Sequence, residues 1–129
     1  MIFVDSTFLI GLVNKKDQWH KDSKRLAPMV KKSERWISNI VMIETLNGLS
    51  KLLDGKQVEI VYNSLNNDYN FYMVDKNIQD KAIQLCKKYN NNVGYADTTH
   101  MVIMEELGIN EIVSFDTHFD NKEGIIRIK

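Results

Sequence analysis

The stretch that decides the fold is Met1-Ile2-Phe3-Val4-Asp5-Ser6-Thr7-Phe8-Leu9-Ile10, at the start of the chain. Residues 1–4 form an unbroken apolar run, which is typical of a strand buried on both faces of a parallel sheet. After this run the apolar residues take helical spacing up to Val13, and the polar residues at 5–7 can cap the free amides of a helix. The sequence therefore predicts a strand, a turn that carries Asp5, and a helix over 6–13.

The rest of the chain repeats this alternation of strands and helices. Further strands are expected at 35–37, 69–74, 112–113 and, as a fifth, 125–128. Helices are expected within 15–33 with a break at Pro28, over 41–53 after a cap at Ser38 or Asn39 and with Gly55 beyond the end, over 56–66, around 82–85, and over 96–107 with Gly108 as the cap. Strands separated by crossover helices predict an α/β fold, a three-layer α/β/α sandwich with a central parallel sheet of four to five strands.

Composition limits the classes of protein to consider. A chain of 129 residues that is 43% hydrophobic fits a single domain over residues 1–129. Its 17 basic and 17 acidic side chains cancel, so no global positive field attracts nucleic acid. Cys86 has no partner for an internal disulfide, and no leader-like start or apolar run of about 18 residues occurs. These observations predict a cytoplasmic protein with no membrane role.

Four acidic residues stand where a parallel sheet would gather them. Asp5 and Asp116 follow predicted strands, and ligands of open parallel sheets bind beyond the carboxyl ends of the strands. Asp97 opens a predicted helix and Glu44 lies in the first two turns of another, at the ends that face the same rim. Clustered carboxylates repel one another unless a cation neutralises them, and an oxygen-rich site suits Mg²⁺ or Mn²⁺. Such a site is suited to hydrolysis of a phosphodiester by metal-activated water.

Each acid also has an ordinary structural explanation. Asp5 and Asp97 stand where helix caps occur, and Asp116 stands in a turn after a strand. Glu44 is compatible with a solvent-facing helix position. The spacing of the four acids matches no short metal-binding motif. The three histidines form no paired motif, which argues against zinc, and His118, two residues from Asp116, is compatible with RNA contact or with an ordinary surface or packing position.

Three stretches resemble one known family. They are residues 2–10, residues 37–44, and Tyr95-Ala96-Asp97 running on to Ser114-Phe115-Asp116-Thr117-His118-Phe119-Asp120. In the order and context of their acids they resemble the PIN-domain ribonucleases, and within these the VapC-type toxins of toxin–antitoxin pairs. The chain departs from many relatives in having Thr98-Thr99 after Asp97.

The resemblance implies roles for individual residues and partners for the chain. Asp5, Glu44, Asp97 and Asp116 would take the metal-binding and catalytic positions, with Ser6, Ser114 and Asp120 supporting them. The family implies a metal-dependent endoribonuclease that leaves a 5′ phosphate and a 3′ hydroxyl, a homodimer, and a cognate antitoxin whose tail occupies the active groove.

Three other interpretations remain open at this point. The chain is also compatible with an RNA-processing nuclease that has no antitoxin. A receiver-like signalling domain would use Asp75, which follows a predicted strand, as the phosphate acceptor beside a metal-binding Asp5. Such a domain requires a second acid next to Asp5, and this chain has Ser6 and Thr7 there. A non-catalytic module would hold a basic partner segment in the acidic pocket. Eight basic residues between Lys15 and Arg35 are compatible either with RNA contact or with an ordinary solvated helix.

Overall fold

The computed structural model describes residues 1–129 and contains one five-stranded sheet in the order β3-β2-β1-β4-β5. Every pair of neighbouring strands is parallel. In chain order the elements are β1 (Ile2–Val4), α1 (Ser6–Val13), α2 (His20–Lys32), β2 (Arg35–Ser38), α3 (Asn39–Gly48), α4 (Gly55–Asp68), β3 (Asn70–Tyr72), α5 (Lys76–Lys88), α6 (Tyr95–Leu107), β4 (Glu111–Val113), the short 3₁₀ helix η1 (Thr117–Phe119) and β5 (Ile126–Ile128). The predicted parallel α/β sandwich is confirmed.

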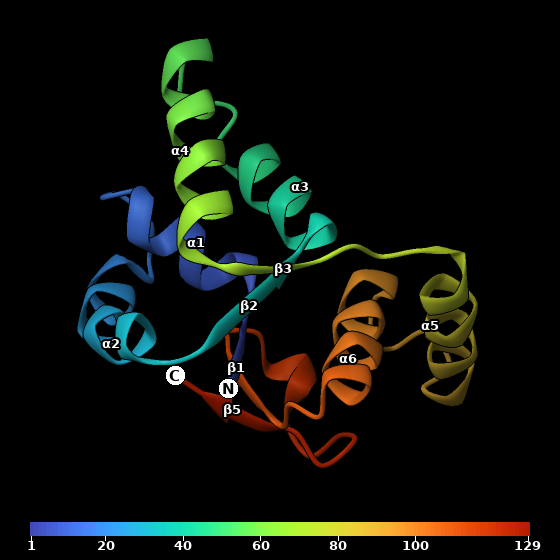
Figure 1. The fold of residues 1–129 in the computed structure, drawn as a ribbon. Coiled ribbons are helices and arrows are strands. Elements are labelled where there is room, and N and C mark those ends of the chain that lie inside the picture. The colour runs from blue at the N-terminus through green and yellow to red at the C-terminus, as the bar shows by residue number, and fades with distance from the viewer.

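The helices cover both faces of the sheet (Figure 1). Helices α1 to α4 lie on one side, and α5 and α6 pack as a pair on the other. This division follows from the strand order, because the chain moves outward from β1 to β2 and β3 and then crosses back to β4. The reversal leaves a switch point between β1 and β4, where parallel sheets commonly bind ligands.

The core is built from the central strands and the helix faces that cover them. Phe3, Val4, Ile37 and Ile112 are fully buried in β1, β2 and β4. Burial on both faces is why β1 is a continuous apolar run rather than an alternating one. No helix is long and apolar enough to cross a membrane.

Two helix predictions are wrong. Helix α2 runs through Pro28 without a break. Proline removes one backbone hydrogen bond, but Pro28 and Lys24 lie on the exposed face, where water can satisfy the freed carbonyl.

The predicted helix over 41–53 extends too far, and the separate helix predicted over 56–66 is α4. Helix α3 ends at Gly48, and Gly55 begins α4 instead of terminating the helix before it. The side chain of Asp54 accepts a hydrogen bond from Gln57 N, and the Gln57 side chain accepts one from Asp54 N. This reciprocal cap fixes the start of a new helix.

Candidate functional site

Asp5 stands at the switch point and is almost fully buried, at 3% exposure. It precedes α1, yet its carboxylate makes no hydrogen bond to the helix amides, so the capping interpretation is wrong for this residue. Its Oδ2 instead accepts hydrogen bonds from Ser114 Oγ at 2.7 Å and Thr7 Oγ1 at 2.9 Å. Two hydroxyl groups therefore fix the orientation of this carboxylate.

Ser114 joins the ends of β1 and β4. It is fully buried, donates to Asp5, and accepts a hydrogen bond from the backbone N–H of Asp116 at 3.0 Å. Thr7 adds a second link, because its Oγ1 also accepts from Phe115 N at 3.1 Å. One network of hydroxyl groups thus positions both strand-end aspartates.

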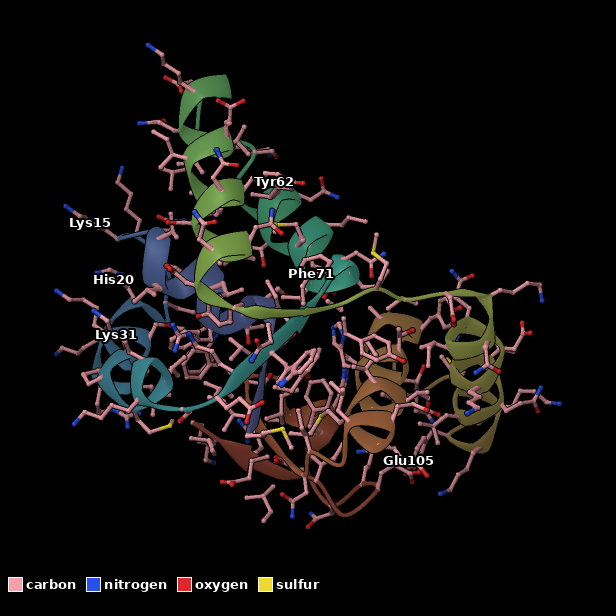
Figure 2. All side chains as sticks on the ribbon, viewed as in Figure 1. Lys15, His20, Lys31, Tyr62, Phe71 and Glu105 are labelled. Atoms are coloured by element: carbon pink, nitrogen blue, oxygen red, sulfur yellow. The ribbon has the colours of Figure 1, made fainter.

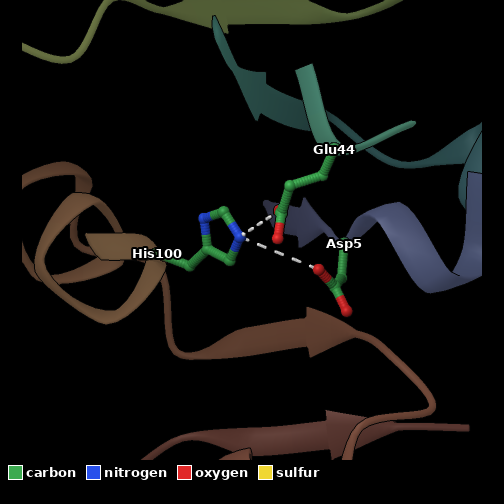
Figure 3. Close-up of side chains that lie close together, drawn as sticks. All are labelled: Asp5, Glu44 and His100. Atoms are coloured by element: carbon green, nitrogen blue, oxygen red, sulfur yellow. Dashed lines mark hydrogen bonds and ion pairs between the residues drawn. The ribbon is translucent and has the colours of Figure 1, made fainter. Parts of the chain in front are cut away.

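Asp5, Glu44 and His100 form the first cluster of polar side chains (Figure 3). Glu44 extends from α3 and His100 from α6, and Nε2 of His100 lies 2.9 Å from Glu44 Oε1 and 3.8 Å from Asp5 Oδ1. The imidazole is fully buried and stands between two carboxylates, whereas one third of the Glu44 side chain is exposed. The cluster therefore opens to solvent on the Glu44 side.

Asp97, Asp116 and His118 form the second cluster. Nδ1 of His118 lies 3.0 Å from Asp97 Oδ2 and 3.2 Å from Asp116 Oδ1. Asp97 is in the first turn of α6 but caps nothing, since Gly94 occupies the capping position. Asp116 does have the turn role expected of it, because its side chain accepts from His118 N in η1.

The two clusters influence each other electrostatically through Asp97. Burial raises the pKa of the Asp97 carboxyl from 3.8 to about 6. The hydrogen bond from His118 opposes this rise, and the charges of Asp116 and Asp5 add to it. Burial and the nearby acids thus penalise the ionised form of Asp97, and a bound cation would relieve that penalty.

Two histidines lie between these carboxylates and carry positive charge when they are protonated. Burial acts to lower the pKa of His100, but the hydrogen bond to Glu44 and the charge of Asp5 outweigh it, so the pKa is raised. The pKa of His118 is raised chiefly by its hydrogen bond to Asp97. The four acids predicted from the sequence lie in two neighbouring clusters of two, and an imidazole contacts both carboxylates of each cluster, whereas the sequence argument gave the task of holding them to a cation alone.

Of the three supporting residues named from the resemblance, two lie at the site and one lies outside both clusters. Ser114 lies at the centre of the site, and Ser6 is buried beside Asp5 at the start of α1. Asp120 joins neither cluster: it forms a two-pronged ion pair with Arg127, with Nε–Oδ1 2.7 Å and Nη2–Oδ2 2.9 Å.

The receiver-like interpretation has no support at Asp75. The Asp75 side chain caps α5 by accepting from Ile78 N. It has no place in either cluster of the site.

Sequence reasoning missed His100 and Thr7. The signal for His100 is its spacing of three residues from Asp97, which puts both side chains on one face of α6. The signal for Thr7 is weaker, since a hydroxyl two residues after a strand-end aspartate occurs in many turns.

The donor set fits a divalent cation. Within each cluster the potential ligand atoms lie within 4.8 Å of one another, and carboxylate oxygens predominate. Hard divalent cations such as Mg²⁺ and Mn²⁺ favour such oxygens. The raised pKa of Asp97 shows that burial, together with the nearby charges of Asp116 and Asp5, disfavours its ionised form, which a bound cation would favour.

Comparisons with known proteins place this geometry in a family. The fold is similar to VapC20 of Mycobacterium tuberculosis, a sarcin-ricin loop cleaving toxin, with TM-score 0.86, 23% identity, and coverage of 100% of this chain and 99% of that one. It is also similar to a chain in a toxin–antitoxin complex from Klebsiella pneumoniae (TM-score 0.75, 18% identity, 98% and 96% covered). A third similar chain is from VapBC2 of Rickettsia felis bound to a promoter DNA fragment (0.70, 15%, 99% and 98%).

These identities show the shared fold, and no curated protein matches the sequence. The model of the PIN domain family matches residues 2–125, nearly the whole chain. The chain therefore belongs to the PIN domain family.

Proposed function

We propose that this protein is a divalent-metal-dependent endoribonuclease that hydrolyses RNA phosphodiester bonds. The observation that carries the proposal is the convergence of Asp5, Glu44, Asp97 and Asp116 at one rim of the sheet, in a chain of the PIN domain family. A site that concentrates negative charge binds a phosphate only when cations are present. The excess of carboxylates therefore supports metal-dependent chemistry on an anionic substrate.

The chain's own residues divide the work. Asp5, Asp97 and Asp116 would hold Mg²⁺ or Mn²⁺, and Ser114 and Thr7 keep Asp5 in one orientation. A bound divalent cation supplies Lewis-acid charge, which polarises a phosphoryl oxygen and lowers the pKa of water.

Glu44 is suited to accept a proton from the attacking water. His100 engages Oε1 of Glu44 and leaves Oε2 without a hydrogen-bond partner, in a side chain that is one third exposed. Because His100 itself is fully buried, it acts as a positioning residue. In-line attack would expel the 3′ oxygen and leave a 5′ phosphate.

We propose further that the enzyme is the toxin of a toxin–antitoxin pair, acting in the cytoplasm as a homodimer. The support is the likeness to VapC20 and to chains found in toxin–antitoxin complexes. An antitoxin would bind the toxin and block the acidic rim. The presence of a short upstream gene for a DNA-binding protein would support this part of the proposal. Co-purification of the two gene products tests it directly.

The decisive experiment combines an activity assay with metal titration. We expect purified protein to cleave single-stranded or looped RNA in Mn²⁺ or Mg²⁺, to stop in EDTA, and to recover on addition of Mn²⁺. Asp5→Asn should abolish cleavage, because it removes a proposed metal ligand. The variant should still fold, because it also removes one of several repelling charges. Activity that survives in this variant refutes the assignment of the site.

The competing interpretations give different results. A non-catalytic binding module would show no cleavage and no heat of Mn²⁺ binding by calorimetry. A processing nuclease without an antitoxin would cleave RNA but would not slow growth when expressed alone. Treatment with acetyl phosphate followed by mass spectrometry should find no phosphorylated Asp75, contrary to the receiver-like interpretation.

A further inference from the structure

A cavity of about 340 Å³ lies directly beside the acidic rim. The residues of its wall that bear on its function are Trp19, Arg25, Phe115, Thr117, Arg127 and Lys129. Phe115 and Thr117 flank Asp116 in the chain, and Arg127 donates through Nη1 to the carbonyl of Ser114 at 3.2 Å. The cavity and the acidic clusters therefore share the segment that follows β4.

The charge of this cavity is opposite to that of the site beside it. Arg25, Arg127 and Lys129 line it, against the single anion Asp22. Asp120, whose side chain is 42% exposed, pairs with Arg127 through two hydrogen bonds. The three cations around this cavity therefore exceed the two acids paired with them, Asp22 and Asp120, by one, in a chain whose side-chain charges cancel overall.

Arg25 is the cation most able to meet a ligand. Its one ion pair, to Asp22 at 3.2 Å, lies on the surface, where both side chains are about half exposed. Such pairs contribute little to stability, so Arg25 can exchange its partner for a phosphate at small cost. Arg127, in contrast, is paired with Asp120, which fixes its position and offsets its charge.

The same cavity has an aromatic wall. The rings of Trp19 and Phe115 stack with centroids 4.9 Å apart and planes 13° apart. Phe115 is buried beneath, and Trp19 is partly exposed above it. An indole supported from below in this way is a rigid surface for a nucleobase, and aromatic stacking tolerates every base.

The basic segment from Lys15 to Arg35 does not act as one surface. Figure 2 shows Lys15 and Lys31 projecting outward from the α1–α2 end of the molecule. Of the eight basic residues in this segment, only Arg25 lines the cavity. Of this basic segment, the structure thus brings only Arg25 to the cavity beside the acidic clusters.

We propose that this cavity binds the nucleotide adjacent to the bond that is cleaved, with Arg25 and Lys129 at its phosphate and Trp19 against its base. The inference rests on the proposed function, because the cavity gains this meaning from the nuclease site beside it. Its cations offset the repulsion that the acidic clusters exert on the RNA backbone. Thr117, exposed at the border between the two, offers a hydroxyl to the same backbone.

The first test compares two double variants that remove the same charge. Arg25→Ala with Lys129→Ala alters the cavity, and Lys21→Ala with Lys24→Ala removes two exposed cations of α2 that do not line it. Binding of a short single-stranded RNA is measured by fluorescence anisotropy in Mn²⁺, with Asp5→Asn present in every protein compared, so that cations are available and no cleavage occurs. We expect the cavity variant to bind about tenfold more weakly per lost charged contact. Its plot of log K against log salt should flatten by about 0.7 per lost phosphate. The control variant should bind like the parent.

The second test observes Trp19 alone. The chain has two tryptophans, so Trp36→Phe leaves Trp19 as the single tryptophan. The substitution breaks no side-chain hydrogen bond, because Trp36 Nε1 makes none. RNA should change the emission of Trp19 with the midpoint found by anisotropy. Unchanged emission at saturating RNA overturns the placement of the base.

The outcomes separate this inference from the proposed function. Equal RNA affinity and salt dependence in both double variants overturns the inference even if the protein cleaves RNA. If the cavity variant binds RNA normally but loses an acidic peptide that the parent binds, the cavity belongs to a protein partner and the inference is likewise overturned. Cleavage with a raised KM and an unchanged kcat in the cavity variant supports it. Absence of RNA cleavage by the parent refutes the proposed function itself.

Discussion

Replacing Asp97 by asparagine should make the metal-free protein more stable. The folded chain raises the pKa of this carboxyl from 3.8 to about 6, chiefly by burial. The folded state therefore binds more protons than the unfolded state between these values, and stability falls as pH rises through that window. A shift of about two units corresponds to at most about 3 kcal/mol. Water at the rim screens part of it, so we expect Asp97→Asn to gain about 1 to 2 kcal/mol at pH 8.

Urea denaturation in EDTA measures this gain. At pH 4 the advantage of Asp97→Asn should be much smaller, because the folded parent carboxyl is then almost fully protonated and the unfolded one, with a pKa of 3.8, is protonated in part. Addition of Mn²⁺ should stabilise the parent and leave the variant almost unchanged. Asp80→Asn, which changes an exposed carboxylate on α5 paired with Lys76, is the matched control and should shift stability by less than about 0.5 kcal/mol. A variant that is less stable than the parent by the same amount at both pH values would refute the reasoning.

Three further substitutions test other parts of the structure. His100→Ala removes a fully buried imidazole from between Asp5 and Glu44, and should cost about 2 to 4 kcal/mol of unfolding free energy at pH 6, measured by thermal or urea unfolding. Because the pKa of His100 is raised, this cost should shrink as the pH rises above that pKa. A cost that does not change with pH contradicts this prediction. Ser114→Ala removes the hydrogen bond to Asp5 and should cost about 1 to 3 kcal/mol of unfolding free energy, while it lowers kcat more than it raises KM. An unchanged kcat would show that this hydrogen bond does not position the Asp5 carboxylate. Gly11→Ala places a methyl group 2.5 Å from Ser23 Oγ, where α1 and α2 cross, and should cost about 1 to 3 kcal/mol in urea with RNA cleavage per folded molecule unchanged; a neutral result would mean that the helices separate freely.

The sequence predicts the strands and most of the helices because their signals are local. The apolar run before Asp5 identifies a buried parallel strand, and Gly108 adopts the left-handed backbone (φ 69°) that ends α6. The errors at Pro28 and Gly55 arise where the same local signal has two meanings. A proline on an exposed helix face is tolerated, and a glycine after a polar residue begins a helix as readily as it follows one.

The sequence also indicates which acids matter, because residues after parallel strands and at helix starts face one rim. It does not reveal their partners. Ser114 donates to Asp5 across 109 residues, and His100 contacts Glu44 across 56. No periodicity encodes such pairs, since they depend on β1 lying next to β4 and on the packing of α6 near α3.

The amino-acid sequence by itself determined the alternation of strands and helices and the placement of Asp5, Glu44, Asp97 and Asp116 at the ends of those elements. Only the tertiary structure decided that two imidazoles stand among these acids, that Asp120 turns away to Arg127, and that a cationic cavity adjoins the site. The physical reason is range. Helix and strand signals act over a few residues of backbone, whereas the charge balance of a buried site is set by whatever the folded chain brings within a few ångströms.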